Sequence, residues 1–198
     1  WFSDNNVKIT KIVVYNELVL FLDIDGKVYQ TGLTSGYVTN KTPTIISYFE
    51  SNNIVLKDIS VGHSHSHYLD INGNVYFYGW SNNGESGMGT TSYTFEPVLV
   101  TTFENIKIKS IFSGNYFSVF IDEDNNIYSS GKNNYGQLGL NTTTDTSIAT
   151  KIENLNNKII IKVKLGYNFA LFLDSNGIVY GCGYNFNGQL GIGNFHTN

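Results

Sequence analysis

Three histidines alternate with serines in one short segment, and their type and spacing suggest metal chemistry. His63, His65 and His67 stand two residues apart. In an extended strand their imidazoles would lie on one face, where two or three ring nitrogens could bind zinc or copper. The segment itself adds no cysteine or carboxylate ligand. Other copies of a repeat described below carry apolar residues at the positions of His65 and His67, so we expect packed strand residues and no metal.

Four aspartates recur at equivalent places, and a pair of carboxylates is what acid–base hydrolysis would need. Each one precedes an Asp-Gly, Asn-Gly or Asp-Asn turn, where a short carboxylate side chain accepts backbone N–H groups. Their spacing assigns them to separate copies of the repeat, which keeps them apart. We therefore expect turn-forming residues at Asp23, Asp70, Asp122 and Asp174.

The glycine-rich segments and the single cysteine are the remaining chemical candidates. The glycine-rich segments lack the lysine-hydroxyl pair of a phosphate-binding P-loop and do not begin a helix. Cys182 lies in a predicted strand, and His196, the only histidine after it, lies in an apparent tail. A nucleophilic cysteine needs an adjacent base. The sequence thus predicts that the chain is not an enzyme and binds no cofactor.

The glycine-rich segments are copies of one another at a fixed spacing. Gly131–Leu140 (GKNNYGQLGL) returns as Gly183–Ile192 (GYNFNGQLGI), 52 residues later, and a weaker copy, Gly79–Met88, begins 52 residues earlier. Self-similarity at this spacing is typical of a repeat architecture.

The elements between these segments have the pattern of short strands. Four phrases join an apolar run to a Val/Ile-Tyr run through a tight turn, which predicts β-hairpins. A short alternating strand that ends at glycine precedes each of the last three hairpins. A fourth apolar segment follows the glycine-rich loop in each of the first three repeats. Four strands per repeat predict an all-β chain built from β-propeller blades. The hairpin phrases are Leu22–Tyr29, Leu69–Tyr76, Ile121–Tyr128 and Leu173–Tyr180.

Together these phrases resemble the regulator of chromosome condensation repeat family. The resemblance rests on the entries Gly62–Ser66, Gly114–Ser118 and Gly166–Ala170, on the hairpins, and on the loops Gly131–Gly139 and Gly183–Gly191. It implies a seven-bladed propeller of four-stranded blades. Members act as exchange factors for small GTPases, as chromatin-binding proteins or as interaction modules.

The repeats divide the chain into about four units, at residues 7–53, 54–105, 106–158 and 159–198. The first unit is degenerate, because Tyr15 replaces the glycine that ends the first strand elsewhere and the glycine-rich loop is reduced to residues 32–36. We expect it to form an edge blade. The last unit is truncated. Four units make only part of a seven-bladed ring, so we expect missing blades or neighbouring subunits to complete it.

Composition narrows the choice of partners. All 12 basic residues are lysines and the net charge is −4, which argues against direct binding to nucleic acid and favours a partner with a basic patch. One cysteine allows no internal disulfide, which favours an intracellular address, cytoplasmic or nuclear. A virion is the other address that the sequence leaves open. No apolar run is long enough for a membrane span.

The variable positions of the glycine-rich loops are the candidate contact residues. Exposed aromatic side chains can anchor a protein interface, whereas packing between adjacent blades is the alternative explanation for them. We predict a non-catalytic protein-interaction scaffold; nucleotide exchange on a Ran-type small GTPase, or a structural role in a filament or viral particle, are the alternatives. The candidate interface residues are Trp80, Lys132, Tyr135, Tyr184 and Phe186.

Overall fold

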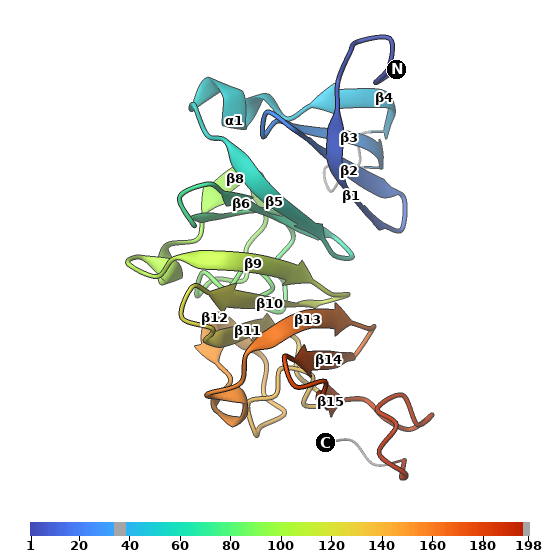
Figure 1. Ribbon diagram of the computed structural model, residues 1–198, viewed down its shortest axis with the longest axis vertical. Helices are drawn as coiled ribbons and strands as arrows, with labels where there is room; N and C mark the ends of the chain where they lie inside the picture. The colour runs from blue at the N-terminus through green and yellow to red at the C-terminus, as the bar shows by residue number, and fades with distance from the viewer. Residues whose placement is uncertain (34–38, 196–198) are drawn as a thin grey trace.

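The computed structural model describes residues 1–33 and 39–195, and within these the chain folds as four antiparallel sheets. The sheets follow one another down the molecule in chain order, with the two termini at opposite ends (Figure 1). The first sheet contains β1 (Ile9–Tyr15), β2 (Leu18–Asp23), β3 (Val28–Leu33) and β4 (Thr39–Ile45). Of the eroded glycine-rich loop predicted at residues 32–36, residues 34–36 lie outside the described part.

The other three sheets repeat this order from one edge to the other. The second contains β5 (Leu56–Val61), β6 (His65–Asp70), β7 (Val75–Gly79) and β8 (Thr94–Leu99). The third contains β9 (Ile108–Ser113), β10 (Phe117–Asp122), β11 (Ile127–Gly131) and β12 (Thr146–Lys151). The fourth has three described strands, β13 (Ile160–Leu165), β14 (Phe169–Asp174) and β15 (Val179–Gly183). The prediction of an all-β chain with four-stranded units is confirmed.

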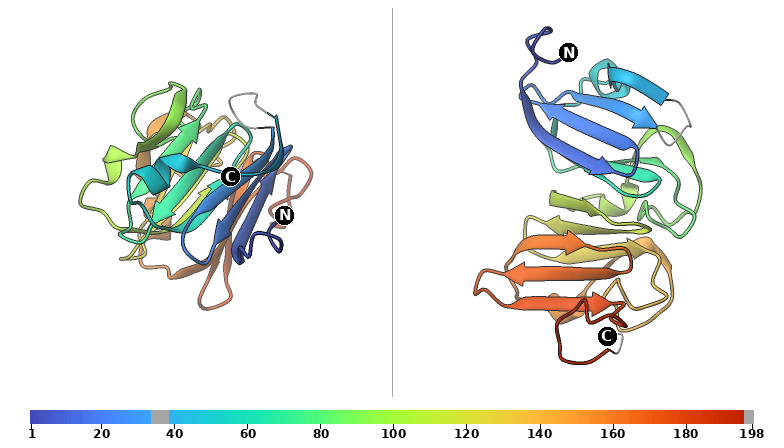
Figure 2. Two further views of the ribbon diagram at one scale, coloured as in Figure 1. Left: turned by 90° about the horizontal axis from the view of Figure 1, so that it is seen from above. Right: turned by 90° about the vertical axis from the view of Figure 1, so that its right-hand side faces the viewer.

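The sheets are arranged as propeller blades around a common axis. The first strands of successive sheets contact one another, β1 with β5, β5 with β9 and β9 with β13. Two perpendicular views show the sheets stacked face to face and rotated relative to each other (Figures 1 and 2). The first strand of each sheet therefore lies on the inside of the arc.

Three separate apolar cores fill the spaces between adjacent sheets. The core between the first and second sheets contains Leu20, Ile59 and Tyr68, and the core between the second and third contains Phe77 and Phe120. The third core is built mainly from the strands of the third and fourth sheets, with Val119 and Phe172 among its members. Strands with two buried faces, such as β6 and β10, therefore lack simple alternation of apolar and polar residues.

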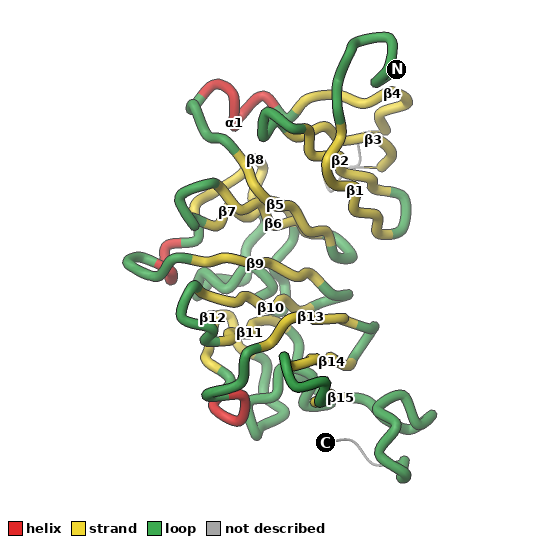
Figure 3. Tube along the Cα trace, in the orientation of Figure 1, coloured by secondary structure: helices red, strands yellow, loops and turns green. Residues whose placement is uncertain are grey.

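Short helical turns join successive sheets, and the sequence patterns do not predict them. They are α1 (Ser47–Ser51) and two 3₁₀ turns, Thr101–Phe103 and Glu153–Leu155, drawn in red in Figure 3. Each places one buried apolar side chain, Phe49, Phe103 or Leu155, into the core between the sheets it connects. Three to five residues are too few to show helical periodicity.

The predicted role of the recurrent aspartates is confirmed at all four hairpins. Asp122 accepts hydrogen bonds from the backbone N–H of Asn126 at 2.7 Å and from the Tyr128 hydroxyl at 3.0 Å. Asp23, Asp70 and Asp174 accept backbone N–H groups of their turns in the same way. Because each carboxylate lies in a different sheet and is used by its own turn, no hydrolytic pair forms.

One close approach recurs where the first strand of a sheet turns into the second. The N–H of Gly114 donates to the carbonyl of Phe117 at 2.8 Å, and the Phe117 ring lies directly over the glycine. A Cβ on Gly114 would come within 2.7 Å of that ring. Gly62 with His65 and Gly166 with Phe169 repeat both the bond and the contact. The glycine is needed because a ring occupies the space of its side chain.

Candidate protein-interaction surface

Two sets of loops meet at one end of the sheets. In an antiparallel sheet, the loop between the first two strands and the end of the third strand lie at the same end. Backbone hydrogen bonds join the two sets: Trp80 N–H to Ser64 at 2.9 Å, Lys132 N–H to Tyr116 at 2.8 Å, and Tyr184 N–H to Asn168 at 2.8 Å. We call this end the loop face; it comprises residues 15–17, 62–64, 80–88, 114–116, 132–140, 166–168 and 184–192.

Recurring polar residues hold the glycine-rich loops in shape. Asn133 accepts the N–H of Leu138 at 2.9 Å and donates to the carbonyl of Thr142 at 2.8 Å. Gln137 accepts the N–H of Tyr135 at 3.0 Å. In the last loop Asn185 and Gln189 make the equivalent bonds. Sequence reasoning assigned these residues no role, although their recurrence in one column was the available signal.

Three of the five predicted interface residues lie together on the loop face. Tyr135 and Tyr184 come from neighbouring loops, with ring centroids 5.0 Å apart, and Tyr184 meets Phe186 at 5.1 Å. Phe186 is 54% exposed. The contact between Tyr135 and Tyr184 is packing between adjacent blades, whereas Phe186 projects to solvent. Packing between blades therefore explains Tyr135 and Tyr184, whereas Phe186 is free to contact a partner.

The other two predicted interface residues, Trp80 and Lys132, make separate contacts. The Trp80 indole packs on Tyr93 with centroids 4.8 Å apart, and the Lys132 ammonium lies 5.3 Å from the centroid of the Tyr116 ring. Such a cation–ring contact is favourable by about 0.5–1 kcal/mol at an exposed site.

A row of rings from the inner loops crosses the loop face, and the sequence analysis missed it. Tyr15 and His63 lie 6.1 Å apart, His63 and Tyr116 4.9 Å, and Tyr116 and Tyr167 6.2 Å, measured between ring centroids. Each ring comes from a different sheet, and Tyr167 is 61% exposed. Burial raises the pKa of both Tyr15 and Tyr116, helped by the neighbouring tyrosines, so these hydroxyls stay neutral donors. Tyr15 donates to the Asn115 side chain at 2.5 Å.

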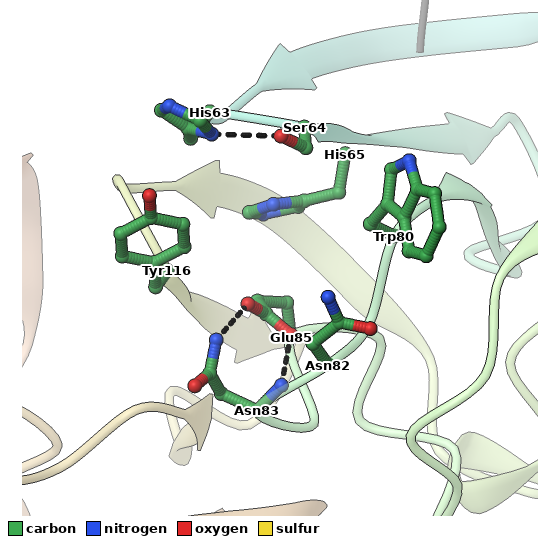
Figure 4. A pocket seen from close by; sticks show the side chains of 8 residues that line it. All are labelled: His63, Ser64, His65, Trp80, Asn82, Asn83, Glu85 and Tyr116. Atoms are coloured by element: carbon green, nitrogen blue, oxygen red, sulfur yellow. Dashed lines mark hydrogen bonds between the residues drawn. The ribbon is translucent and has the colours of Figure 1, made fainter. Parts of the chain in front are cut away.

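A cavity of about 290 Å³ opens on this face between the second and third sheets (Figure 4). Its floor includes Glu85, whose two carboxylate oxygens accept the backbone and side-chain N–H groups of Asn83 at 2.9 and 2.6 Å. Glu85 is 3% exposed, and burial raises its pKa. The lining residues are His63, Ser64, His65, Trp80, Asn82, Asn83, Glu85 and Tyr116.

The histidines behave as packed residues where the repeat predicts it. His65 and His67 are buried in β6, where His65 Nε2 meets the Ser118 hydroxyl at 3.2 Å and His67 Nδ1 the Ser113 hydroxyl at 3.1 Å. Burial lowers the pKa of both, that of His67 to about 3, so both rings are neutral.

The geometry of the histidine segment does not gather metal ligands. The idea that three imidazoles share one strand face is wrong for His63, because β6 begins only at His65 and His63 lies in the preceding loop. In residues 1–33 and 39–195, no three His, Cys, Asp or Glu side chains converge on a cation position. Cys182 is half-buried, burial raises its pKa to about 12, and His196 lies outside the described residues. No helix in the described part is long and apolar enough to cross a membrane.

Comparison with known families agrees with this architecture. The regulator of chromosome condensation (RCC1) repeat matches residues 72–121 and 124–173, and a second description of the same repeat matches residues 108–137 and 160–189. The chain belongs to the RCC1 repeat family. The matched stretches run from the second hairpin to the last glycine-rich loop, so the loop face is built largely from family repeats.

Individual proteins resemble part or nearly all of the chain. The ultraviolet-B receptor UVR8 of Arabidopsis thaliana is 32% identical over 117 residues, which cover 59% of this chain and 27% of the receptor. The structure of human WBSCR16 has a TM-score of 0.82 at 18% identity and covers 96% of this chain. Prp20p of Saccharomyces cerevisiae has a TM-score of 0.78 at 21% identity and covers 92%. The chain spans about half the length of these solved chains, 51% and 45% respectively.

Proposed function

We propose that this chain is a non-catalytic protein-interaction propeller, acting inside the cell, whose loop face binds a partner protein. The observation that carries the proposal is the row of rings contributed by all four sheets to one face. Aromatic side chains supply large contact area at a small cost in side-chain entropy, and they are enriched among residues that dominate binding energy. Asn133 and Gln137 hold the neighbouring glycine-rich loop, which adds Tyr135 to the same face.

The partner that fits this face is a protein with a basic surface. The chain carries a net charge of −4, and opposite net charges speed association and favour the correct partner. The family relationship supports a partner of protein type, since the Prp20p structure is described with binding properties to Gsp1p and histones.

The test compares two variants that each remove two exposed or half-exposed side chains. Trp80→Ala with Tyr184→Ala alters the loop face, whereas Ile71→Ala with Ile178→Ala alters hairpin turns at the opposite end. Proteins captured from a cell extract would be identified and their direct binding measured with purified components. We expect the loop-face variant to lose at least tenfold in affinity and the control to keep it. Equal loss in both variants, or none, contradicts the proposal.

The alternative is nucleotide exchange on a small GTPase, which rests on the family resemblance alone. It predicts that catalytic amounts of the chain accelerate release of a labelled guanine nucleotide from a loaded Ran-type GTPase. Release at the intrinsic rate, with saturating chain present, removes this alternative and leaves the binding proposal intact.

We also propose that further blades or neighbouring subunits cover the two end sheets. The four proposed repeat units, at residues 7–53, 54–105, 106–158 and 159–198, make only part of a seven-bladed ring. Ile12 and Val14 are exposed on the outer face of the first sheet, and Ile161 and Val179 on that of the fourth. Exposed apolar sheet faces are typical of interaction surfaces. Light scattering measures the assembly state; a monomer at all concentrations excludes completion by copies of this chain, and a structural assembly built from them.

A further inference from the structure

The cavity on the loop face carries a buried acidic group whose charge has no internal partner. Among residues 1–33 and 39–195, ion pairs join the N-terminal ammonium to Asp4, Lys11 to Asp58, and Lys27 to Glu50. None of them reaches Glu85, which is 3% exposed. A buried carboxylate without a counter-charge is costly even when N–H groups bond to it, so a proton or a bound cation stabilises it further.

Glu85 replaces an amide that the other loops use for the same structural purpose. It stands in the column of Gln137 and Gln189, and like them it accepts the N–H of the residue two positions earlier. Glutamine would therefore satisfy the loop without any charge. Unlike glutamine, the carboxylate brings a negative charge to the cavity while its oxygens still accept the N–H groups of the loop.

Aromatic side chains line the cavity together with this carboxylate. Figure 4 shows Tyr116 and Trp80 on opposite sides of the cavity, with the His65 ring between them and Glu85 below. The faces of Trp and Tyr rings attract cations, and the Tyr116 ring already has the Lys132 ammonium 5.3 Å from its centroid. The cavity volume, about 290 Å³, lies at the lower limit of small-molecule sites, which are roughly 300–1,000 Å³.

We propose that this cavity receives one basic side chain of the partner protein, with its cationic end directed at Glu85. This inference rests on the proposed function, because the side chain would belong to the protein bound at the loop face. An anionic group would meet the Glu85 charge, and an apolar group would leave that charge unpaired. A lysine or an arginine side chain satisfies both the carboxylate and the rings.

The test uses Trp80 as the reporter of occupancy. The chain has two tryptophans, so Trp1→Phe leaves Trp80 as the only one. Its fluorescence would be titrated with acetylated, amidated tripeptides Gly-Arg-Gly and Gly-Lys-Gly, and with Gly-Gln-Gly as the neutral control. We expect saturable changes with the two cationic peptides and none with the neutral one. The cationic peptide that binds with the higher affinity identifies the side chain, arginine or lysine, that the cavity prefers.

Glu85→Gln is the matched variant, because two other loops carry glutamine at this position. We expect it to weaken cationic binding about tenfold or more, since a hydrogen bond to a charged group contributes about 1.5–3 kcal/mol. Lys132→Gln provides a second variant that does not depend on the folding of the first. It removes a like charge beside Tyr116, so we expect tighter binding of the same peptides.

Three outcomes overturn the inference: equal binding of the neutral peptide, unchanged affinity in Glu85→Gln, or no saturable signal from any peptide. Failure here is distinguishable from failure of the proposed function. Suppose that the Trp80→Ala, Tyr184→Ala variant loses affinity for a captured partner while Glu85→Gln keeps it. The loop face is then an interface, but the cavity does not bind a basic side chain of that partner.

Discussion

Acidification from pH 7 to pH 5 is expected to destabilise the fold through His65 and His67. Both rings are buried and neutral, and burial lowers the pKa of each from the ordinary 6.5, that of His67 to about 3. The unfolded chain therefore binds protons below pH 6.5 that the folded chain does not. Stability is lost as the pH falls through 6.5, and the loss continues until the folded pKa is reached.

The magnitude follows from the width of that interval. Each pH unit below 6.5 costs about 1.4 kcal/mol for one ring, so at pH 5 His67 costs about 2 kcal/mol, and His65 adds a loss of the same sign. Glu85 acts in the opposite direction, because burial raises its pKa and the folded state then takes up the proton first. The net loss is therefore smaller than the sum for the two rings, but still large against a typical domain stability of about 5–15 kcal/mol.

The assay is urea unfolding at several pH values and constant ionic strength. The reference is His65→Phe with His67→Val, which installs the residues that the third sheet carries as Phe117 and Val119. Glu85 and the hairpin aspartates are the same in both proteins, so the difference between the two pH profiles isolates the imidazoles. We expect the variant to lose less stability between pH 7 and pH 5. Parallel profiles would refute the reasoning.

Three further substitutions test the packing and turn assignments by thermal or urea unfolding. Asp122→Ala removes the acceptor of a backbone N–H and a tyrosine hydroxyl and should lower the free energy of unfolding by about 1–3 kcal/mol. The control Asp124→Ala, at an exposed residue of the same turn, should be close to neutral. Equal effects of the two variants would contradict the turn role of Asp122. Gly136 has φ +76°, so Gly136→Val should lower the free energy of unfolding by about 1–2 kcal/mol or more. An unchanged unfolding midpoint would show that the loop accommodates the side chain without strain. Tyr15→Phe removes the bond to Asn115 and should cost about 1 kcal/mol; no change would mean that this link between sheets is unimportant.

The hairpins and the propeller order could be predicted from sequence because their determinants are local. The turn residues around Asp70 and Asp122 fix two strands within about ten residues of chain, and the repeat spacing then orders the sheets. The short helical turns were missed because Phe49 and Phe103 stand in segments of five and three residues, too short for the apolar spacing of an amphipathic helix to recur.

The candidate surface was only partly predictable, because it depends on contacts between repeats. The loop positions of Trp80 and Tyr184 stood out as variable residues in a regular column. The cavity joins Trp80 and Glu85 to Tyr116, which belongs to the next sheet. Alignment alone shows that Glu85 differs from Gln137, but only the geometry shows that its charge is buried beneath aromatic rings.

The division of the interior into three separate cores has a consequence for how the molecule opens and how such chains evolve. Each core joins only two neighbouring sheets, so loosening an outermost sheet leaves the inner cores in place. Backbone amides of β1 and β14 should accordingly exchange with deuterium sooner than those of β6 and β10. A gene that gains or loses one such segment changes the length of the stack without redesigning the segments that remain.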